Sequence, residues 1–133
     1  MMNYDKYLNS TLAVICARGN SKGLKNKNIL KINNKPLIFY AINKIFKNKL
    51  QYRCISSDSS KILNISNKLG LKNFFIRPKK LSTSNVSKLM VWKHALIESE
   101  KYFNKKFKYF LDIEITNPLT DQSDLKKFLK DFY

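Results

Sequence analysis

The stretch that decides the fold is residues 12–28, which read LAVICARGNSKGLKNKN. Its first part, LAVICA, is a continuous apolar run, which is typical of a β-strand buried on both faces of a sheet. The rest, residues 18–28, is mostly polar and contains two glycines and four basic side chains. We therefore expect a core strand that opens directly into a long loop.

Strand-like and helix-like segments alternate along the rest of the chain. Further strands are predicted over residues 52–57, 73–76 and 108–115. The helices are predicted to begin at Pro36, at Asp58 or Ser59, at Ser84 or Asn85, and at Asp121. Their predicted apolar stripes are Leu37, Ile38, Ala41, Ile45 and Phe46; then Ile62, Ile65 and Leu69, ended by Gly70; then Val86, Leu89, Met90, Ala95 and Ile97; and last Leu125, Phe128, Leu129 and Phe132.

This alternation predicts an α/β fold, a mostly parallel sheet with helices on both faces, in one domain over residues 1–133. In such sheets, ligands bind beyond the carboxyl ends of the strands. The candidate binding loops are therefore residues 18–28, 57–59, 77–85 and 114–120.

The composition of residues 18–28 favours anion binding. Gly19 and Gly23 allow backbone N–H groups to approach an anion closely, and Arg18, Lys22, Lys25 and Lys27 could surround a triphosphate. The loop matches neither the P-loop spacing GxxxxGK[ST] nor the dinucleotide fingerprint GxGxxG. From the residues alone, a nucleotide or sugar-phosphate site is favoured over a plain surface loop, and both interpretations stay open.

The charge and cysteine content narrow the classes of function. The chain has 26 basic and 9 acidic residues, a net charge of +17, which favours anionic partners. Only three of the basic residues are arginines and the lysines are dispersed, so a solvated surface is favoured over a nucleic-acid groove. Cys16 and Cys54 lie in apolar runs, which predicts core thiols in a reducing compartment and no zinc site. With no apolar run near 20 residues, we expect a cytoplasmic protein.

The run AVICARGNSKGLKNKNI resembles the N-terminal signature of acylneuraminate cytidylyltransferases, A-R-G-x-S-K-G-L-x-x-K-N. Three more segments follow in the family's order. ISSDSSKI is similar to a strand that ends in S-T-D-S, FIRPKKLSTSNVS to an R-P-x-E-L-A-x-D-x-x-S loop, and LDIEITNPLT to an L-L-Q-P-T-S-P-L-R turn. Together these matches cover residues 13–120, most of the chain.

The resemblance implies a Rossmann-like nucleotidyltransferase core of the GT-A type. It also implies transfer of CMP from CTP to a nine-carbon sugar acid, with Mg²⁺ assisting and pyrophosphate leaving. By motif position, the implied catalytic residues are Lys27 and Arg18. The implied nucleotide-binding residues are Arg18, Gly19, Ser21, Lys22, Gly23, Lys27, Asn28 and Arg77. The implied sugar-acid side consists of Ser87, Glu114, Thr116 and Asn117.

The chain departs from the family pattern mainly on the implied sugar-acid side. The family pattern has, in order, an acidic residue, an aspartate, a serine, a glutamine and an arginine. At these positions this chain has Lys80, Ser84, Lys88, Glu114 and Thr120. Arg77 has an equally weighted interpretation as a strand-end surface residue. Asp58 is preferred as a helix cap and His94 as a packed side chain.

The resemblance also implies a longer protein. In the family, the metal-holding aspartates and the dimerisation segment lie in a C-terminal part that this chain lacks. We therefore expect an incomplete cytidylyltransferase domain, with Mg²⁺ ligands outside the chain and a homodimer where the C-terminal part is present. The alternatives are a nucleotide-binding module without turnover and a basic nucleic-acid binder, which charge alone supports.

Overall fold

The computed structural model describes residues 2–19 and 27–115 of the chain. Within them lie helices α1 (Met2–Leu8), α2 (Leu37–Lys47), α3 (Ser60–Lys68) and α4 (Lys88–Phe103). The strands are β1 (Thr11–Cys16), β2 (Lys31–Ile32), β3 (Lys35–Pro36), β4 (Tyr52–Ser56) and β5 (Tyr109–Asp112). Two 3₁₀ turns cover Lys27–Ile29 and Lys79–Leu81.

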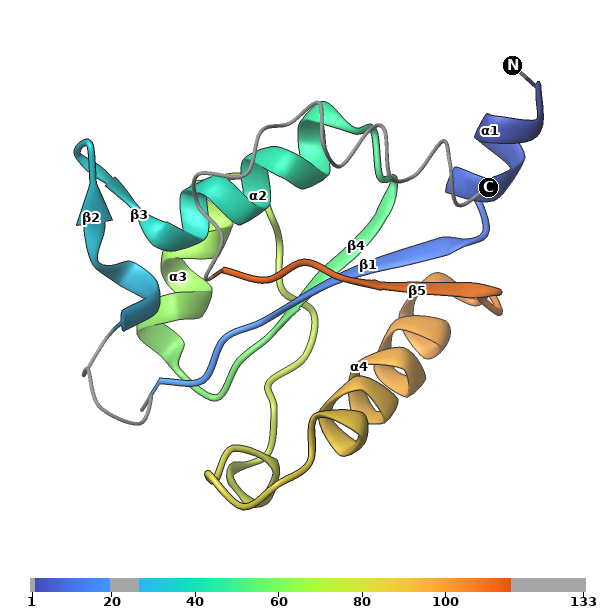
Figure 1. Cartoon of the computed structure of the whole chain (residues 1–133). Coiled ribbons are helices and arrows are strands. Elements are labelled where there is room, and N and C mark those ends of the chain that lie inside the picture. Colours follow the sequence, from blue (N-terminus) through green and yellow to red (C-terminus); the bar gives the residue numbers. More distant parts are fainter. Residues whose placement is uncertain (1, 20–26, 116–133) are drawn as a thin grey trace.

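The main sheet has the order β4-β1-β5, and both pairings are parallel. In the register, Val14 of β1 lies between Cys54 of β4 and Asp112 of β5. Helices α2 and α3 cover one face of this sheet and α4 covers the other (Figure 1). The predicted fold class, a parallel α/β sheet with helices on both faces, is confirmed.

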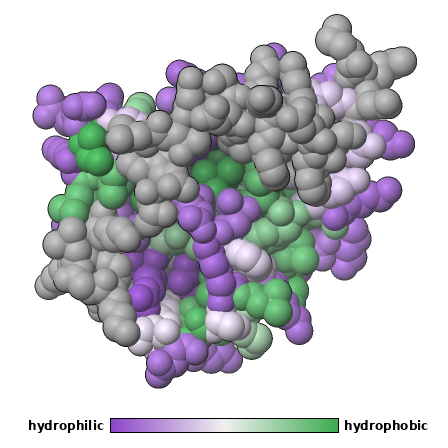
Figure 2. Space-filling view, in the orientation of Figure 1, coloured by the Kyte–Doolittle hydropathy of each residue, from purple (hydrophilic) through white to green (hydrophobic). Residues whose placement is uncertain are grey.

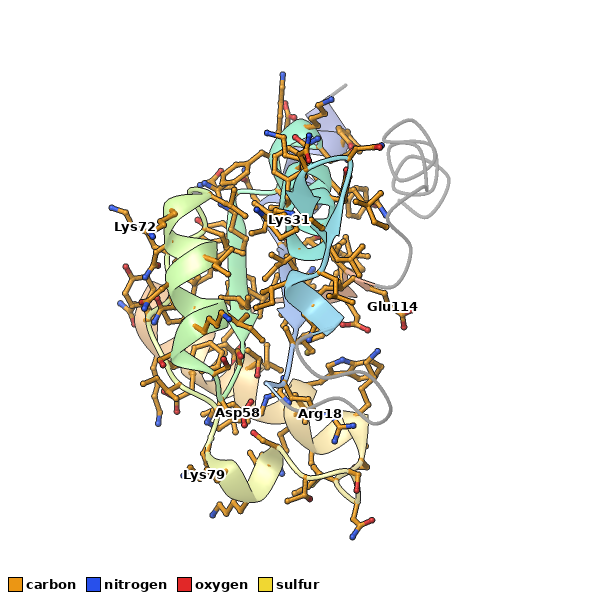
Figure 3. The ribbon with its side chains drawn as sticks, turned by 90° about the vertical axis from the view of Figure 1, so that its left-hand side faces the viewer. Arg18, Lys31, Asp58, Lys72, Lys79 and Glu114 are labelled. Carbon is orange, nitrogen blue, oxygen red and sulfur yellow. The ribbon has the colours of Figure 1, made fainter. Side chains whose placement is uncertain are left out.

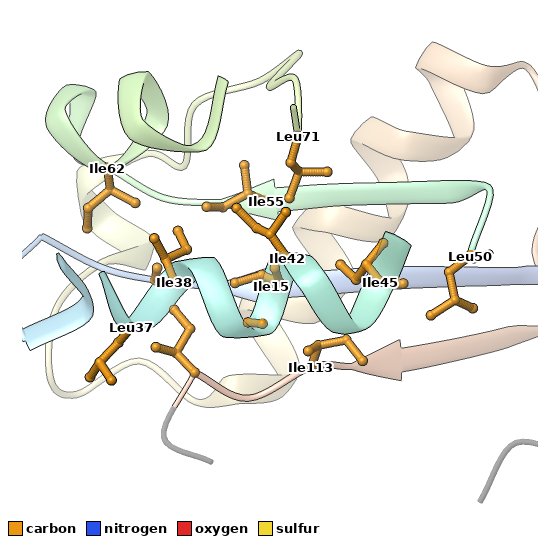
Figure 4. Close-up of a cluster of buried hydrophobic side chains, with 14 of the residues drawn as sticks. Ile15, Leu37, Ile38, Ile42, Ile45, Leu50, Ile55, Ile62, Leu71 and Ile113 are labelled. Carbon is orange, nitrogen blue, oxygen red and sulfur yellow. The ribbon is translucent and has the colours of Figure 1, made fainter. Parts of the chain in front are cut away.

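Alternate residues of β1 enter two separate cores, as the two-residue period of a strand requires. Ala13 and Ile15 pack with α2 and α3 in the larger core, where Ile38, Ile42 and Ile45 are almost fully buried (Figure 4). Leu12 and Val14 point to the opposite face and pack with Cys54, Phe75 and Ala95. The LAVICA run is therefore apolar throughout because both faces of its strand are covered.

A small hairpin, β2 and β3, follows the first loop and leads into α2. Asn33 and Asn34 connect its strands with φ angles of 52° and 63°. Positive φ at both central residues is the geometry of a type I′ turn, which asparagine tolerates better than most residues. The Leu37 N–H then donates to the Leu30 carbonyl, which fixes the hairpin against the start of α2.

Several predicted boundaries are wrong. Residues 73–76 form no strand, and the residue after them, Arg77, donates its backbone N–H to the carbonyl of Ser57, which follows β4. Pro36 is the N-cap of α2 rather than its first residue. Of the two caps predicted for α3, Ser59 is confirmed, because its hydroxyl accepts the Ile62 N–H; the preference for Asp58 as a helix cap is wrong. The helix predicted from Asp121 lies outside the described residues.

Helix α4 differs most from its prediction. Its cap is Ser87 rather than Ser84 or Asn85, and its buried face is Val91, Ala95 and Ser99. Leu89, Met90 and Ile97, which were expected to be buried, are 69%, 52% and 41% exposed. Apolar residues occur on both sides of this helix, so periodicity alone could not identify the side that faces the sheet.

The surface agrees with the expected layer of solvated lysines. Hydrophilic residues cover much of the described surface on the face drawn in Figure 2, with smaller hydrophobic areas between them. Across residues 2–19 and 27–115, no helix has both the length and the apolar character needed to cross a bilayer.

The larger core can be tested by removing one of its side chains. We expect Ile42→Ala to lower the free energy of unfolding by about 2–4 kcal/mol, because it opens a cavity at a side chain that is 2% exposed. The matched control is Ile97→Ala, also within a helix but 41% exposed, which should change it by less than about 1 kcal/mol. Urea denaturation measures both, and equal losses would contradict this assignment of core and surface.

Candidate functional site

The three parallel strands end at the same edge of the sheet, and the predicted polar loops follow them there. Arg18 and Gly19 come directly after β1, Ser57 and Asp58 after β4, and Glu114 after β5. Figure 3 views the molecule from the side toward which the strands run, and in it Arg18 and Asp58 lie close together. This edge is the one at which doubly wound sheets bind ligands.

Arg77 is fixed at the end of β4 by its own guanidinium. The residue is 4% exposed, and its Nε donates to Ser56 Oγ at 2.9 Å while Nη2 donates to the Ser56 carbonyl at 2.7 Å. Burial lowers the pKa of Arg77 from its ordinary value. The interpretation of Arg77 as a strand-end surface residue is therefore wrong: it is a buried cation that joins the segment after residue 76 to the sheet.

The first loop is tied down where it leaves β1. The Gly19 N–H donates to Asp58 Oδ1 at 2.8 Å, so Asp58 holds this loop instead of capping α3. A Cβ atom at Gly19 would lie 3.0 Å from the Cβ of Ser59, which explains why glycine is suited to this close approach. On the far side of the loop, Asn28 Nδ2 donates to the Arg18 carbonyl at 3.1 Å.

A cavity of about 270 Å³ lies between these loops and the start of α4. Three of its lining residues, Arg18, Arg77 and Lys88, are cations that come from different parts of the chain. The remaining lining residues are Cys16, Leu81, Thr83, Ser84, Val86 and Val91. The lining of the cavity therefore combines cationic, hydroxyl and apolar side chains. This composition suits an anionic ligand that also has a flat or apolar part.

Lys88 enters the cavity from the first turn of α4 and pairs with two carboxylates. Its Nζ lies 2.7 Å from Asp112 Oδ2 and 3.1 Å from Glu114 Oε1. Burial would lower the pKa of Lys88, but the hydrogen bonds that Nζ donates to these carboxylates, together with their negative charges, outweigh burial and raise it. Lys88 is therefore charged at neutral pH.

The two cysteines are unreactive by environment. Burial and the nearby Asp112 carboxylate raise the pKa of Cys16 to about 12. Burial also raises the pKa of Cys54 to about 12, although Ser99 donates a hydrogen bond to its sulfur at 3.4 Å. Neither thiol carries appreciable thiolate at neutral pH, so nucleophilic catalysis by these cysteines is excluded.

His94 is a packed side chain, as expected. Its ring meets the ring of Phe75 edge-on at a centroid distance of 5.4 Å, and burial lowers its pKa. It is neutral at pH 7 and lines no part of the cavity at the sheet edge.

The structure brings some of the predicted site residues together, and others lie outside the described residues. Arg18 and Arg77 line the cavity. Gly19 is bonded to Asp58, and Asn28 is bonded to the Arg18 carbonyl. Ser87 caps α4, its Oγ accepting the Met90 N–H at 3.4 Å, and Glu114 pairs with Lys88. Lys27 begins a 3₁₀ turn. Ser21, Lys22, Gly23, Thr116 and Asn117 lie outside the described residues.

Two residues that contribute to the site were not predicted from the sequence. Ser56 anchors Arg77, and Lys88 supplies the third cation of the cavity. The one signal for Lys88 was its departure from the family pattern, which by itself gave no indication of its partners. Ser56 lies in the segment ISSDSSKI, which resembles a family motif, but the motif gave no indication that Ser56 anchors Arg77.

Comparison with known proteins agrees with this arrangement. The model of the cytidylyltransferase family matches residues 12–132. The chain is 39% identical over 126 residues to the post-translational flagellin modification protein B of Campylobacter coli, covering 94% of this chain and 54% of that protein. It is 41% identical over 108 residues to the CMP-N,N'-diacetyllegionaminic acid synthase of Campylobacter jejuni, covering 80% and 46%.

The fold is also that of a solved nucleotide-sugar synthetase. The structure of CMP:2-keto-3-deoxy-manno-octonic acid synthetase complexed with CTP superposes with a TM-score of 0.64 at 17% identity, covering 91% of this chain and 46% of that one. The chain spans about half the length of the curated relatives that it matches.

The anchoring of Arg77 is testable without any ligand. We expect Arg77→Lys to lower the free energy of unfolding by about 2–4 kcal/mol, because lysine keeps the charge but cannot make both bonds to the buried Ser56. The matched control is Arg53→Lys, whose Nη1 bond to the Leu50 carbonyl is part-exposed, and which should cost less than about 1 kcal/mol. Urea denaturation of the two variants decides, and a stable Arg77→Lys would show that charge alone is needed.

Proposed function

The chain belongs to the cytidylyltransferase family, and on that premise we propose that it binds CTP at the carboxyl edge of its sheet. The reaction proposed for the protein is transfer of CMP from CTP to a sugar acid of the sialic acid type. The relatives' names include an N-acylneuraminate, a legionaminic acid and a pseudaminic acid cytidylyltransferase or synthase. This chain would supply the CTP-binding part.

The observation that carries the proposal is the convergence of cations on one cavity. Arg18, Arg77 and Lys88 line it, directly beyond the ends of β1 and β4. A triphosphate brings several negative charges, and charge-assisted hydrogen bonds to it are about twice as strong as neutral ones. The sequence of the glycine-containing loop at residues 18–28 carries three further lysines, Lys22, Lys25 and Lys27.

Each residue has a proposed task. Arg18 and Lys22 hold the β- and γ-phosphates, and Lys27 stabilises the charge that builds on the α-phosphate. Gly19, Ser21, Gly23 and Asn28 shape the loop around the phosphates. Arg77 borders the cytidine with Nη1, since its Nε and Nη2 are engaged by Ser56. The sugar acid is assigned to the side formed by Ser87, Glu114, Thr116 and Asn117.

The proposed chemistry is one displacement at phosphorus. The anomeric oxygen of the sugar acid attacks the α-phosphorus as its hydroxyl proton is released, and the bond to the bridging oxygen of the β-phosphate breaks. Pyrophosphate leaves and the CMP-sugar remains. In such transfers, catalysis consists mainly of positioning and charge stabilisation, which the cations at this edge suit.

Mg²⁺ assists such reactions, but the described residues do not form a site for it. Within residues 2–19 and 27–115, no group of three or more His, Cys, Asp or Glu side chains could hold a metal ion. Asp58 accepts the Gly19 N–H, while Asp112 and Glu114 face Lys88. The proposal therefore assigns Mg²⁺ to the phosphates and to groups outside these residues, and no step above depends on a metal ligand here.

A second candidate function is a nucleotide-binding module without turnover. The observation in its favour is that the chain spans about half the length of the relatives that it matches. A homodimer stays a proposal that follows from the resemblance, and a cytoplasmic location stays a proposal drawn from the apolar pattern of the sequence. Recognition of nucleic acid is not proposed. Binding and turnover measured separately distinguish the two functions.

Binding is predicted to be selective for CTP. We expect calorimetry to show tighter binding of CTP than of ATP, and Arg18→Ala and Lys22→Ala each to weaken CTP binding by about tenfold or more, because each loses a charge-assisted phosphate contact. Lys27→Ala should weaken it less, because its interaction strengthens mainly in the transition state. Absence of CTP binding at millimolar concentration would refute the proposal, and equal affinity for all four triphosphates would reduce it to generic anion binding.

Turnover by these 133 residues alone is predicted to be little or none. The reason is length, since the relatives provide roughly twice as many residues to build the sugar-acid and metal sites. A pyrophosphate-release assay with CTP, Mg²⁺ and N-acetylneuraminic acid measures it, with sugar omitted as the control. Clear sugar-dependent release would contradict this expectation and would eliminate the module without turnover.

A further inference from the structure

Both arginines of the cavity are tied to one short segment, residues 56–58 at the end of β4. The Ser56 carbonyl accepts two hydrogen bonds, from the Ala17 N–H at 2.9 Å and from Arg77 Nη2 at 2.7 Å. Ala17 directly precedes Arg18 in the chain. The Arg77 guanidinium is therefore bonded to the same carbonyl as the residue before Arg18, and both arginines line the cavity.

Asp58 holds the chain on the other side of Arg18. Its Oδ1 accepts the Gly19 N–H at 2.8 Å, and Figure 3 shows Asp58 close to Arg18. A Cβ atom at Gly19 would lie 3.0 Å from the Ser59 Cβ and 3.7 Å from Asp58 Oδ1, so the loop passes close to the start of α3. Arg18 is thus fixed on both sides, by the bond of the preceding residue to Ser56 and of the following residue to Asp58.

The Asp58 carboxylate projects from backbone that is itself held on both sides. Ser57 is fully buried, its carbonyl accepts the Arg77 N–H at 2.9 Å and its hydroxyl accepts the Ser59 N–H at 3.1 Å. Ser59 in turn caps α3. A short side chain between two such residues has few alternative positions, so Asp58 offers the Gly19 N–H an acceptor at a fixed place.

The charge of Asp58 by itself would disfavour a phosphate ligand, because like charges repel. Burial lowers the pKa of Arg77, while the nearby Asp58 carboxylate raises it and Arg18 lowers it. The three charged groups therefore lie within electrostatic reach of one another. A favourable effect of Asp58 on phosphate binding must come from its hydrogen bond to Gly19 and not from its charge.

We propose that Asp58 is a positioning residue of the nucleotide site, which holds the Gly19 N–H so that Arg18 keeps its place beside Arg77 before the nucleotide binds. This inference rests on the proposed function and deepens it. Asp58 is not among the described residues that line the cavity, so it acts through the chain at Gly19. Without this bond the glycine would gain backbone freedom, and ordering it again on binding would lower the affinity.

Two rival explanations of Asp58 predict different results. If only its charge matters, removing the charge strengthens phosphate binding and losing the acceptor has no further effect. If only the stability of the fold matters, any variant that is equally destabilised binds equally poorly. A positioning role needs the acceptor atom and not the charge, so asparagine, whose side-chain oxygen also accepts, restores what alanine loses.

The test measures binding of CTP and, separately, of inorganic pyrophosphate by calorimetry, alongside urea denaturation. We expect Asp58→Ala to weaken binding of both ligands by about five- to thirtyfold, the factor that corresponds to fixing the backbone of one residue. Asp58→Asn should restore binding to within about threefold of the parent protein, or bind more tightly, since it keeps the acceptor and removes a repelling charge. The matched control is Ser59→Ala, which removes the cap of α3 but not the Gly19 bond and should change binding by less than about twofold.

A second variant covers the case in which Asp58→Ala fails to fold. Asp58→Glu keeps the charge, but its extra methylene displaces the acceptor from the Gly19 N–H, so it should weaken binding of both ligands by about threefold or more. Parental binding by Asp58→Glu would then overturn the inference.

Three other results would also overturn it. They are parental or tighter binding by Asp58→Ala, binding by Asp58→Asn as weak as that by Asp58→Ala, and an equal loss in Ser59→Ala. If the parent protein binds pyrophosphate but not CTP, the proposed function is refuted while pyrophosphate still tests Asp58. If the parent binds neither ligand, the proposed function and the inference both fail.

Discussion

The described fold depends on β1 being paired on both edges and covered on both faces. Because β4 and β5 both run parallel to it, all three strands deliver their carboxyl ends to one edge. Ala13 and Ile15 hold α2 and α3 on one face, while Leu12 and Val14 hold the α4 side on the other. Arg18 and Gly19 therefore follow a strand that is held on both edges and on both faces.

The cations at the sheet edge differ in the groups that hold their side chains. Arg77 is buried and uses two of its nitrogens on Ser56, so most of its binding capacity serves the fold. Lys88 is half exposed but is matched by two carboxylates. Arg18 also lines the cavity, at the start of the glycine-containing loop. A count of positive charges alone would treat Arg77 and Lys88 as equivalent, whereas Arg77 is held by Ser56 and Lys88 by two carboxylates.

The sequence predicted what depends on local pattern and missed what depends on tertiary contact. Where an apolar pattern fits only one kind of element, the prediction agrees with the structure. This holds for the strands predicted at residues 12–17 and 52–57 and for helices α2 and α3. Helix α4 has apolar residues on two sides, so its buried face was decided by the sheet and not by its own period. Asp58 and Ser59 are both good caps, and Ser59 took the cap because Asp58 binds Gly19, a residue 39 positions away. The phosphate-binding roles proposed for the glycine-containing loop at residues 18–28 stay predictions.

Departures from a family pattern can be interpreted together when the structure shows which of the changed side chains are in contact. Lys88 and Glu114 were noted as two separate replacements of neutral residues, 26 positions apart in the sequence. In the structure they form one ion pair, with Asp112 as the second acceptor. A lone lysine or a lone glutamate at this edge would have changed the charge that a nucleotide meets, whereas the pair leaves the sum unchanged. Paired replacement of this kind therefore changes the side chains at this edge of the sheet while leaving its net charge unchanged.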